Sequence, residues 1–176
     1  MSRFQLSVRA RLAALLAFTN IFLVAAAAYS WYSISRLNAQ LQAVITAEQR
    51  VQSAADVARK AQLDFKVQVQ EWKDTLLRGA SPAAFTKYHD DFLRRSHAVD
   101  KDLASLKQQM AALGLDTRGV DAALATHAEL QRRYDAALLK YDGKRPESTH
   151  VVDSLVAGMD RPPTDAIDAL VTGMKD

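Results

Sequence analysis

Lys66 and Lys73 are two cations whose type and spacing suit the binding of an anion. Neither has an acidic residue three or four positions away, whereas other cations, such as Lys60 with Asp56, form pairs of opposite charge at that spacing. The lysines are one heptad apart, so both lie on one face of a helix, beside its apolar stripe. They are candidates for capturing an anionic ligand or a partner helix. The alternative interpretation is that both are ordinary solvated lysines.

Three polar residues, Gln62, Ser96 and His127, occupy positions where the helical pattern predicts a core. Counting along each helix from one end of the predicted bundle puts them near the height of a proline-containing break at residues 160–163. One hypothesis is that a small molecule fills this polar layer and shifts the last helix. The alternative is that the three side chains satisfy backbone groups freed by the prolines, directly or through water.

Catalytic motifs are absent from the sequence, which has no glycine-rich phosphate loop and no nucleophile elbow. The absence of cysteine excludes a disulfide scaffold, a thiol nucleophile and a thiolate metal site. His89 and Asp90 are adjacent, so on a helix they point about 100° apart and cannot share a metal ion. We therefore expect a protein that is not an enzyme and holds no metal and no cofactor.

Helices must position the candidate residues, because helical periodicity dominates beyond the apolar N-terminal segment and no strand pattern competes. Apolar positions with alternating spacings of four and three predict a first helix that ends at Arg78. A second is predicted over 82–113, a third over 120–141, and a fourth from about Glu147 with a break at residues 160–163. The predicted fold is all-α, an antiparallel up-down-up-down four-helix bundle whose first helix is continuous with an N-terminal transmembrane helix.

The predicted core stripes follow this spacing along each helix. In the first helix the stripe comprises Leu37, Leu41, Val44, Glu48, Val51, Ala55, Ala58, Gln62, Phe65, Val69, Trp72 and Leu76. In the fourth helix the stripe before the break comprises Val152, Leu155 and Met159.

Residues 12–35 carry no formal charge. As a helix they would cover about 36 Å, enough to cross a hydrocarbon core of about 30 Å. Arginines precede the segment and aromatic residues close it: Arg3, Arg9 and Arg11, then Tyr29, Trp31 and Tyr32. Because arginines favour the cytoplasmic side and aromatic rings favour the interface, we expect residues 1–11 in the cytoplasm and residues 12–35 across the membrane.

A cleaved signal peptide is the alternative, with the run Ala25–Ala28 as a small-residue cleavage site. An uncleaved anchor is favoured because the apolar run is longer than a signal core of about 7–15 residues. Within the segment, Asn20 either hydrogen-bonds to a partner helix or is a tolerated polar residue. The net charge of +3 comes from the four arginines that flank the segment, Arg3, Arg9, Arg11 and Arg36, because without them acidic residues outnumber basic ones by one. No nucleic-acid surface is expected.

Two segments resemble a known family: residues 58–79, ARKAQLDFKVQVQEWKDTLLRG, and residues 158–170, GMDRPPTDAIDAL. With the membrane anchor and the bundle, they resemble the sensor half of bacterial methyl-accepting chemotaxis receptors. The resemblance implies a homodimer in the bacterial inner membrane, with residues 36–176 as a periplasmic sensor domain. It also implies a small ligand, an amino acid or a carboxylate, held by cationic and polar side chains. The candidate ligand-binding residues are Gln62, Lys66, Lys73, Ser96, His127, Arg133, Tyr134 and Arg161.

In such receptors a helix shift crosses the membrane to a cytoplasmic hairpin that engages the coupling protein and the histidine kinase. This sequence contains neither that hairpin nor a second apolar span. Because the last helical pattern does not stop before Asp176, we expect the natural chain to continue into a second membrane helix. Two other interpretations stay open: the sensor of another transmembrane signalling protein, such as a histidine kinase or cyclase, and a membrane-anchored helical scaffold.

Overall fold

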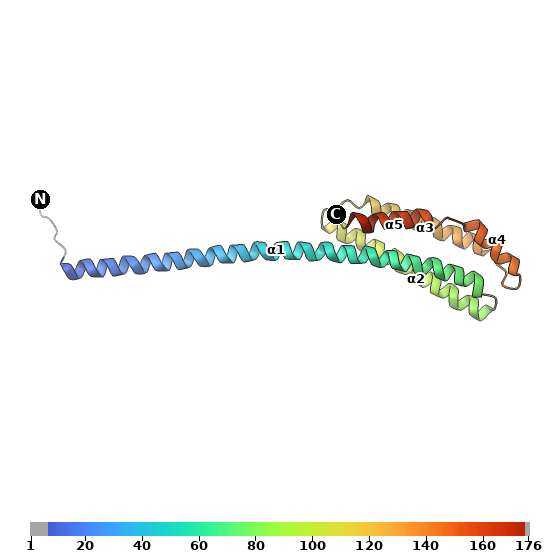
Figure 1. The fold of residues 1–176 in the computed structure, drawn as a ribbon, viewed down its shortest axis with the longest axis horizontal. Coiled ribbons are helices and arrows are strands. Elements are labelled where there is room, and N and C mark those ends of the chain that lie inside the picture. The colour runs from blue at the N-terminus through green and yellow to red at the C-terminus, as the bar shows by residue number, and fades with distance from the viewer. Residues whose placement is uncertain (1–6, 175–176) are drawn as a thin grey trace. The chain divides into compact units, whose positions relative to one another are not determined.

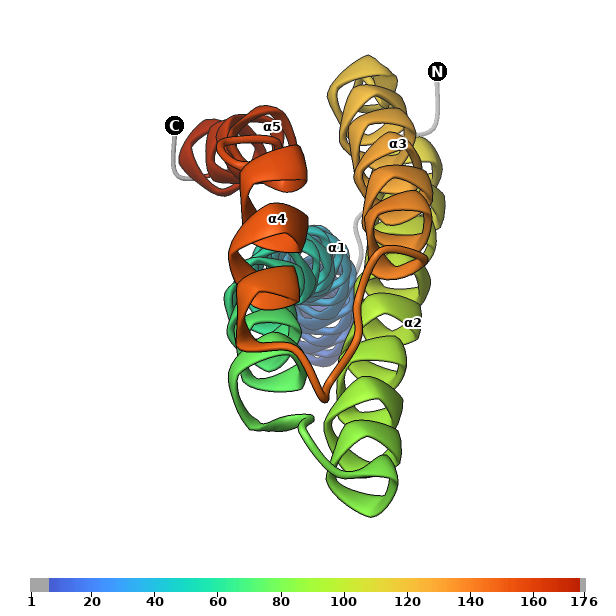
Figure 2. The same cartoon turned by 90° about the vertical axis from the view of Figure 1, so that its right-hand side faces the viewer.

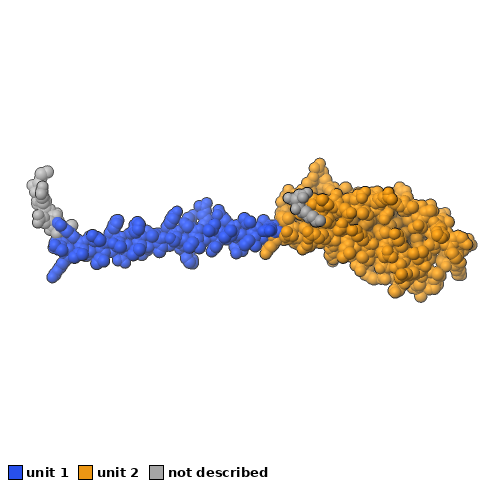
Figure 3. Space-filling model, viewed as in Figure 1, with its two compact units in different colours: residues 1–48 blue, residues 49–176 orange. Residues whose placement is uncertain are grey.

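The computed structural model describes residues 7–174, which form five helices and contain no strand. The helices are α1 (Val8–Arg78), α2 (Pro82–Ala112), α3 (Arg118–Leu138), α4 (Pro146–Val156) and α5 (Arg161–Gly173) (Figure 1). The all-α prediction is confirmed. Two residues used in the sequence analysis, Arg3 and Asp176, lie outside the described residues. Arg3 is one of the arginines that predict a cytoplasmic N-terminus, and Asp176 is the residue beyond which we expect the chain to continue. The chain divides into two compact units, residues 1–48 and 49–176 (Figure 3).

Unit 1 contains the N-terminal part of α1, whose side chains are exposed from Arg11 to Glu48. Among the described residues, α1 is long and apolar enough to cross a membrane, which is consistent with a membrane protein. Its polar side chains bond within the helix: the Asn20 amide nitrogen donates to the carbonyl oxygen of Leu16 at 2.8 Å. Such a bond lowers the cost of placing an amide in hydrocarbon.

The helices of unit 2 begin and end close to the predicted positions, but α3 ends at Leu138, three residues before the predicted end at 141. Ser81 caps α2 by accepting a hydrogen bond from the Ala84 amide, and Pro82 occupies the first turn. The predicted break in the fourth helix is present and separates α4 from α5, but it lies at residues 157–160 and not at the predicted 160–163. Gly158 lies in this break with a φ of +74°, a left-handed conformation that strains other residues. Pro162 and Pro163 follow in the first turn of α5, where a missing N–H costs little.

The core of unit 2 is formed by side chains from all five helices; its largest fully buried apolar members are Trp72, Phe92, Leu103, Leu106, Leu130 and Ile167. In α1, Ala61 and Gln68 are buried, whereas the predicted core residues Gln62 and Val69 are only half-buried. The buried face is therefore rotated slightly from the predicted stripe. Leu155 was predicted in the core and is 46% exposed, because α4 ends one residue later and its neighbours Val152 and Val156 face inward.

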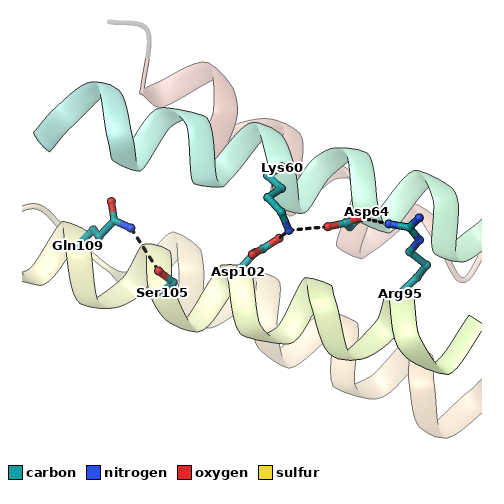
Figure 4. A network of polar contacts seen from close by, with 6 residues as sticks. All are labelled: Lys60, Asp64, Arg95, Asp102, Ser105 and Gln109. Atoms are coloured by element: carbon teal, nitrogen blue, oxygen red, sulfur yellow. Dashed lines mark hydrogen bonds and ion pairs between the residues drawn. The ribbon is translucent and has the colours of Figure 1, made fainter. Parts of the chain in front are cut away.

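Helix α3 packs against α2, α4 and α5. In the end-on view of Figure 2, α4 and α5 lie on one side of unit 2, and α2 and α3 lie on the other. Helices α1 and α2 are joined by a charge cluster of Lys60, Asp64, Arg95 and Asp102 (Figure 4). The Lys60 ammonium lies 2.9 Å from Asp64 and 2.6 Å from Asp102, and Arg95 donates to Asp64 at 2.7 Å.

This cluster predicts a pH dependence. Burial favours a higher pKa for Asp64, but the hydrogen bonds from Lys60 and Arg95 outweigh it and hold the pKa below 3.8. A lowered pKa stabilises the fold at pH values above the unfolded pKa, and the contribution disappears as the pH falls through the folded pKa. Asp64→Asn is expected to cost about 1–3 kcal/mol at pH 7, and the difference from the unsubstituted chain is expected to shrink towards pH 3.

Urea unfolding at pH 7, 5, 4 and 3 measures this effect. The matched control is Asp56→Asn, which removes an exposed carboxylate whose partner is Arg59 on the same helix. Such a surface pair contributes about 0–1 kcal/mol. A constant difference between Asp64→Asn and the unsubstituted chain from pH 7 to pH 3 would contradict the prediction.

Candidate functional site

A polar cavity of about 230 Å³ lies beneath the break between α4 and α5. Helix α1 contributes Trp72 and Lys73 to its wall, and α3 contributes Tyr134. Asp153 lies in α4, and Asp160 directly precedes α5. The remaining lining residues are Val69, Val156, Ala157 and Gly158. The cavity therefore joins three parts of the chain that are far apart in sequence.

Three charged residues line this cavity: Lys73, Asp153 and Asp160. Within residues 7–174, Lys73, Asp153 and Asp160 form no ion pair. One cation and two anions thus line the same small volume. A ligand that carries both a negative and a positive group would complement them, because each charge of the protein would find an opposite charge.

Two aromatic side chains of the cavity lining, Trp72 and Tyr134, carry hydrogen-bond donors. Trp72 is 2% exposed, and its indole Nε1–H has no hydrogen-bond partner among the described residues. Such an unsatisfied buried donor costs about 1–3 kcal/mol. Burial, together with the charges of Asp160 and Asp153, raises the pKa of Tyr134, so its hydroxyl keeps its proton and can donate. The two rings stack with centroids 4.2 Å apart.

Local structure explains how the residues meet. Trp72 and Lys73 are consecutive, so the indole faces the core of unit 2 while the lysine lies about 100° further round α1, at the edge. Gly158 turns the chain after α4, and its left-handed φ lets α5 begin in a new direction. Asp153 and Asp160 lie on either side of this turn. The break therefore shapes one wall of the cavity.

A network of polar side chains around His127 is the second candidate site. His127 is 1% exposed; its Nδ1 lies 2.7 Å from Asp100 Oδ1, and its Nε2 lies 2.8 Å from Gln68 Oε1. Ser96 donates to Gln131 Oε1 at 2.9 Å, and Gln131 donates to Asp135. The network connects α3 with α1 and α2 through buried polar groups. Because its buried polar groups have hydrogen-bond partners, the network has a structural role in fixing how these helices pack.

The structure places the predicted ligand-binding residues in several locations. Lys73 and Tyr134 line the polar cavity, and Ser96 and His127 belong to the network. Gln62, which was predicted in one polar layer with Ser96 and His127, lies apart from the network and donates to Asp168 of α5 at 2.6 Å. Gln68 contacts His127 instead.

The other three candidates are exposed and lie outside the polar cavity. Arg133 is paired with Glu129 at 2.7 Å. Lys66 and Arg161 make no ion pair within the described part of the chain.

Sequence reasoning missed Asp153 and Asp160, which line the polar cavity. The two acids carry the same pattern that singled out Lys66 and Lys73. They are one heptad apart, and neither has a lysine or arginine three or four positions away. Applying that test to acidic as well as basic residues would have found them. Among the described residues, no group of three or more His, Asp or Glu is placed to hold a metal ion.

Comparison with known proteins gives one partial similarity. A stretch of 53 residues is 45% identical to the methyl-accepting chemotaxis protein CtpH of Pseudomonas aeruginosa. The stretch covers 30% of this chain and 9% of that protein, so the chain spans a small part of the relative it matches. No family model and no solved structure matches the chain. The similarity supports a role related to chemoreceptors.

Proposed function

We propose that this chain is the sensor module of a transmembrane chemoreceptor in the bacterial inner membrane. Residues 1–11 are cytoplasmic, residues 12–35 cross the membrane, and residues 36–176 form a periplasmic domain that binds a small ligand. The observation that carries the proposal is the polar cavity at the break between two helices, where charges of both signs make no ion pair with any residue of the range 7–174. The partial similarity to a chemotaxis protein supports it.

The proposed architecture is an antiparallel four-helix bundle in which α4 and α5 together form the fourth helix. Polar contacts support this topology because their order reverses between partner helices. From α2 to α3 they run Ser96–Gln131, Asp100–His127 and Lys107–Asp121. From α1 to the last two helices they run Gln62–Asp168 and Leu76–Thr149. As the residue number rises along one helix, the residue number of its contact on the other helix falls, as antiparallel packing requires.

The proposed ligand is a small amino acid or carboxylate in the polar cavity. Its carboxylate faces the Lys73 ammonium, with the Tyr134 hydroxyl as a further donor. An amino acid fits better than a bare carboxylate, because its ammonium would complement Asp153 and Asp160.

The proposed mechanism is a population shift. Ligand in the cavity stabilises one arrangement of α4 and α5 against α1, to the extent that it binds that arrangement more tightly. In a homodimer this shift would pass through the membrane helices to the coupling protein and the histidine kinase. The apolar residues Leu37, Leu41 and Val44 are exposed in the single chain, and we propose that they contact the second copy.

The test is a ligand screen on the full chain in lipid nanodiscs. A panel of amino acids, dicarboxylates and citrate is followed by thermal unfolding and by the fluorescence of Trp72 in a Trp31→Phe background. A ligand at about 100 times its dissociation constant is expected to stabilise the fold by about 2.7 kcal/mol. A flat screen would favour a scaffold over a sensor.

Lys73→Met is expected to weaken binding by about tenfold or more, which corresponds to about 1.4 kcal/mol. The physical reason is the loss of the cation that faces the ligand carboxylate. Lys66→Met is the matched control, since Lys66 is an exposed lysine of the same helix outside the cavity. Equal loss of affinity in the two variants would place the ligand elsewhere.

A further inference from the structure

An apolar cavity of about 410 Å³ lies between α3 and the start of α5. Ala125, Thr126 and Leu130 of α3 form one wall. Met159, Pro162 and Pro163 form the other. It shares no lining residue with the polar cavity, although both adjoin the break between α4 and α5.

The walls of this apolar cavity offer few hydrogen-bonding groups to an occupant. The Thr126 hydroxyl is already bonded to carbonyl oxygens of its own helix, at Ala122 and Ala123. Pro162 and Pro163 have no backbone N–H, and their fixed φ makes that wall rigid. An occupant therefore gains affinity by burying apolar surface against a preformed wall. The Met159 thioether adapts to irregular shapes and packs well on aromatic rings.

Charge is confined to one part of the apolar cavity, where Glu129 and Arg133 contribute to the lining. Glu129 accepts hydrogen bonds from both Arg132 and Arg133, so one carboxylate lies between two guanidinium groups. The three residues together carry an excess positive charge. Because Arg132 also holds Glu129, Arg133 can bond to a ligand without leaving the carboxylate unpaired. A single anionic group on the occupant would complement this edge.

We propose that the apolar cavity is a second ligand site, which binds a planar aromatic monocarboxylate. The ring packs between Leu130 and the two prolines, with Met159 against it, and the carboxylate bonds to Arg133. A cavity of about 150 Å³ holds a benzene ring, so the volume here suits one ring or two fused rings. Such a ligand bridges α3 and the first turn of α5.

Isothermal titration calorimetry of the full chain in nanodiscs tests the proposal, with 2-naphthoate as probe and empty nanodiscs as blank. Neutral 2-naphthamide has the same ring without the charge. We expect 2-naphthoate to bind at least tenfold more tightly than 2-naphthamide. Arg133→Gln is expected to remove this difference. Arg132→Gln makes the same charge change on a residue outside the lining, and it should alter 2-naphthoate affinity less than threefold.

A variant that fills the apolar cavity provides a second test of the proposal. Ala125→Phe fills the cavity from an exposed position on α3, so the fold should tolerate it, and binding of both probes should be lost. Lys73→Met, in the polar cavity, should leave 2-naphthoate affinity unchanged. The proposal is overturned by absence of binding at millimolar probe, by binding that persists in Ala125→Phe, or by equal losses in Arg132→Gln and Arg133→Gln. Each outcome is independent of whether an amino acid binds in the polar cavity.

Discussion

Trp72→Ala is expected to destabilise unit 2 by about 3–5 kcal/mol, the range observed when a buried tryptophan or phenylalanine is truncated. The indole is among the largest fully buried side chains. It stacks on Tyr134 at 4.2 Å and lies 5.6 Å from the Phe92 ring, measured between centroids. Truncation would leave a void between α1, α2 and α3 and remove both aromatic contacts. Chemical denaturation of the full chain in detergent, followed by circular dichroism, measures the loss.

Two variants make this result interpretable. Leu77→Ala truncates an exposed residue of the same helix and should change the free energy of unfolding by less than about 0.5 kcal/mol. Trp72→Phe keeps one aromatic ring, and the indole N–H that it removes has no partner within residues 7–174. It should therefore cost clearly less than Trp72→Ala. A loss below about 1 kcal/mol for Trp72→Ala would show that this residue is not buried as described.

His127→Leu is expected to cost about 1–3 kcal/mol, although leucine is the more apolar side chain. The substitution removes the partner of Gln68 Oε1, which is fully buried, and the partner of Asp100. An amide oxygen left in the core without a hydrogen bond loses its solvation and gains nothing in return. Gln68→Leu should cost a similar amount, because it leaves the imidazole Nε2 without its partner.

The double variant distinguishes this explanation from a simple packing effect. When both partners become apolar, no polar group of the pair stays unsatisfied, so His127→Leu with Gln68→Leu should cost less than the two single changes added together. The expected coupling is about 1–2 kcal/mol. Additive losses would mean that the two side chains do not interact. Higher stability of His127→Leu alone would mean that the polar network opposes folding.

These two predictions concern the same region as the proposed ligand site. Trp72 belongs to the polar cavity, and Gln68, one turn earlier in α1, belongs to the network. A variant of Trp72 therefore changes stability and ligand binding together. Lys73→Met is the cleaner probe of binding, since Lys73 is exposed and makes no ion pair in the described part of the chain.

The sequence alone determined the class of the fold and the positions of its turns. Spacings of four and three predicted the helices, Ser81 and Pro82 predicted the start of α2, and the prolines at 162 and 163 predicted the separation of α4 from α5. These features are local. A helix, a cap and a proline break depend on residues within a few positions of each other, so their physical causes are present in the sequence itself.

The tertiary structure alone decided which side chains share a site. A small rotation of α1 about its axis, set by packing against its neighbours, buries Gln68 instead of Gln62 and makes Gln68 the partner of His127. The same packing brings Lys73 to Asp153 and Asp160 and leaves Arg133 at the apolar cavity. An apolar stripe is more than 100° wide, so the pattern fixes the buried face but not its centre. Contacts between helices that are distant in sequence determine the centre of the buried face.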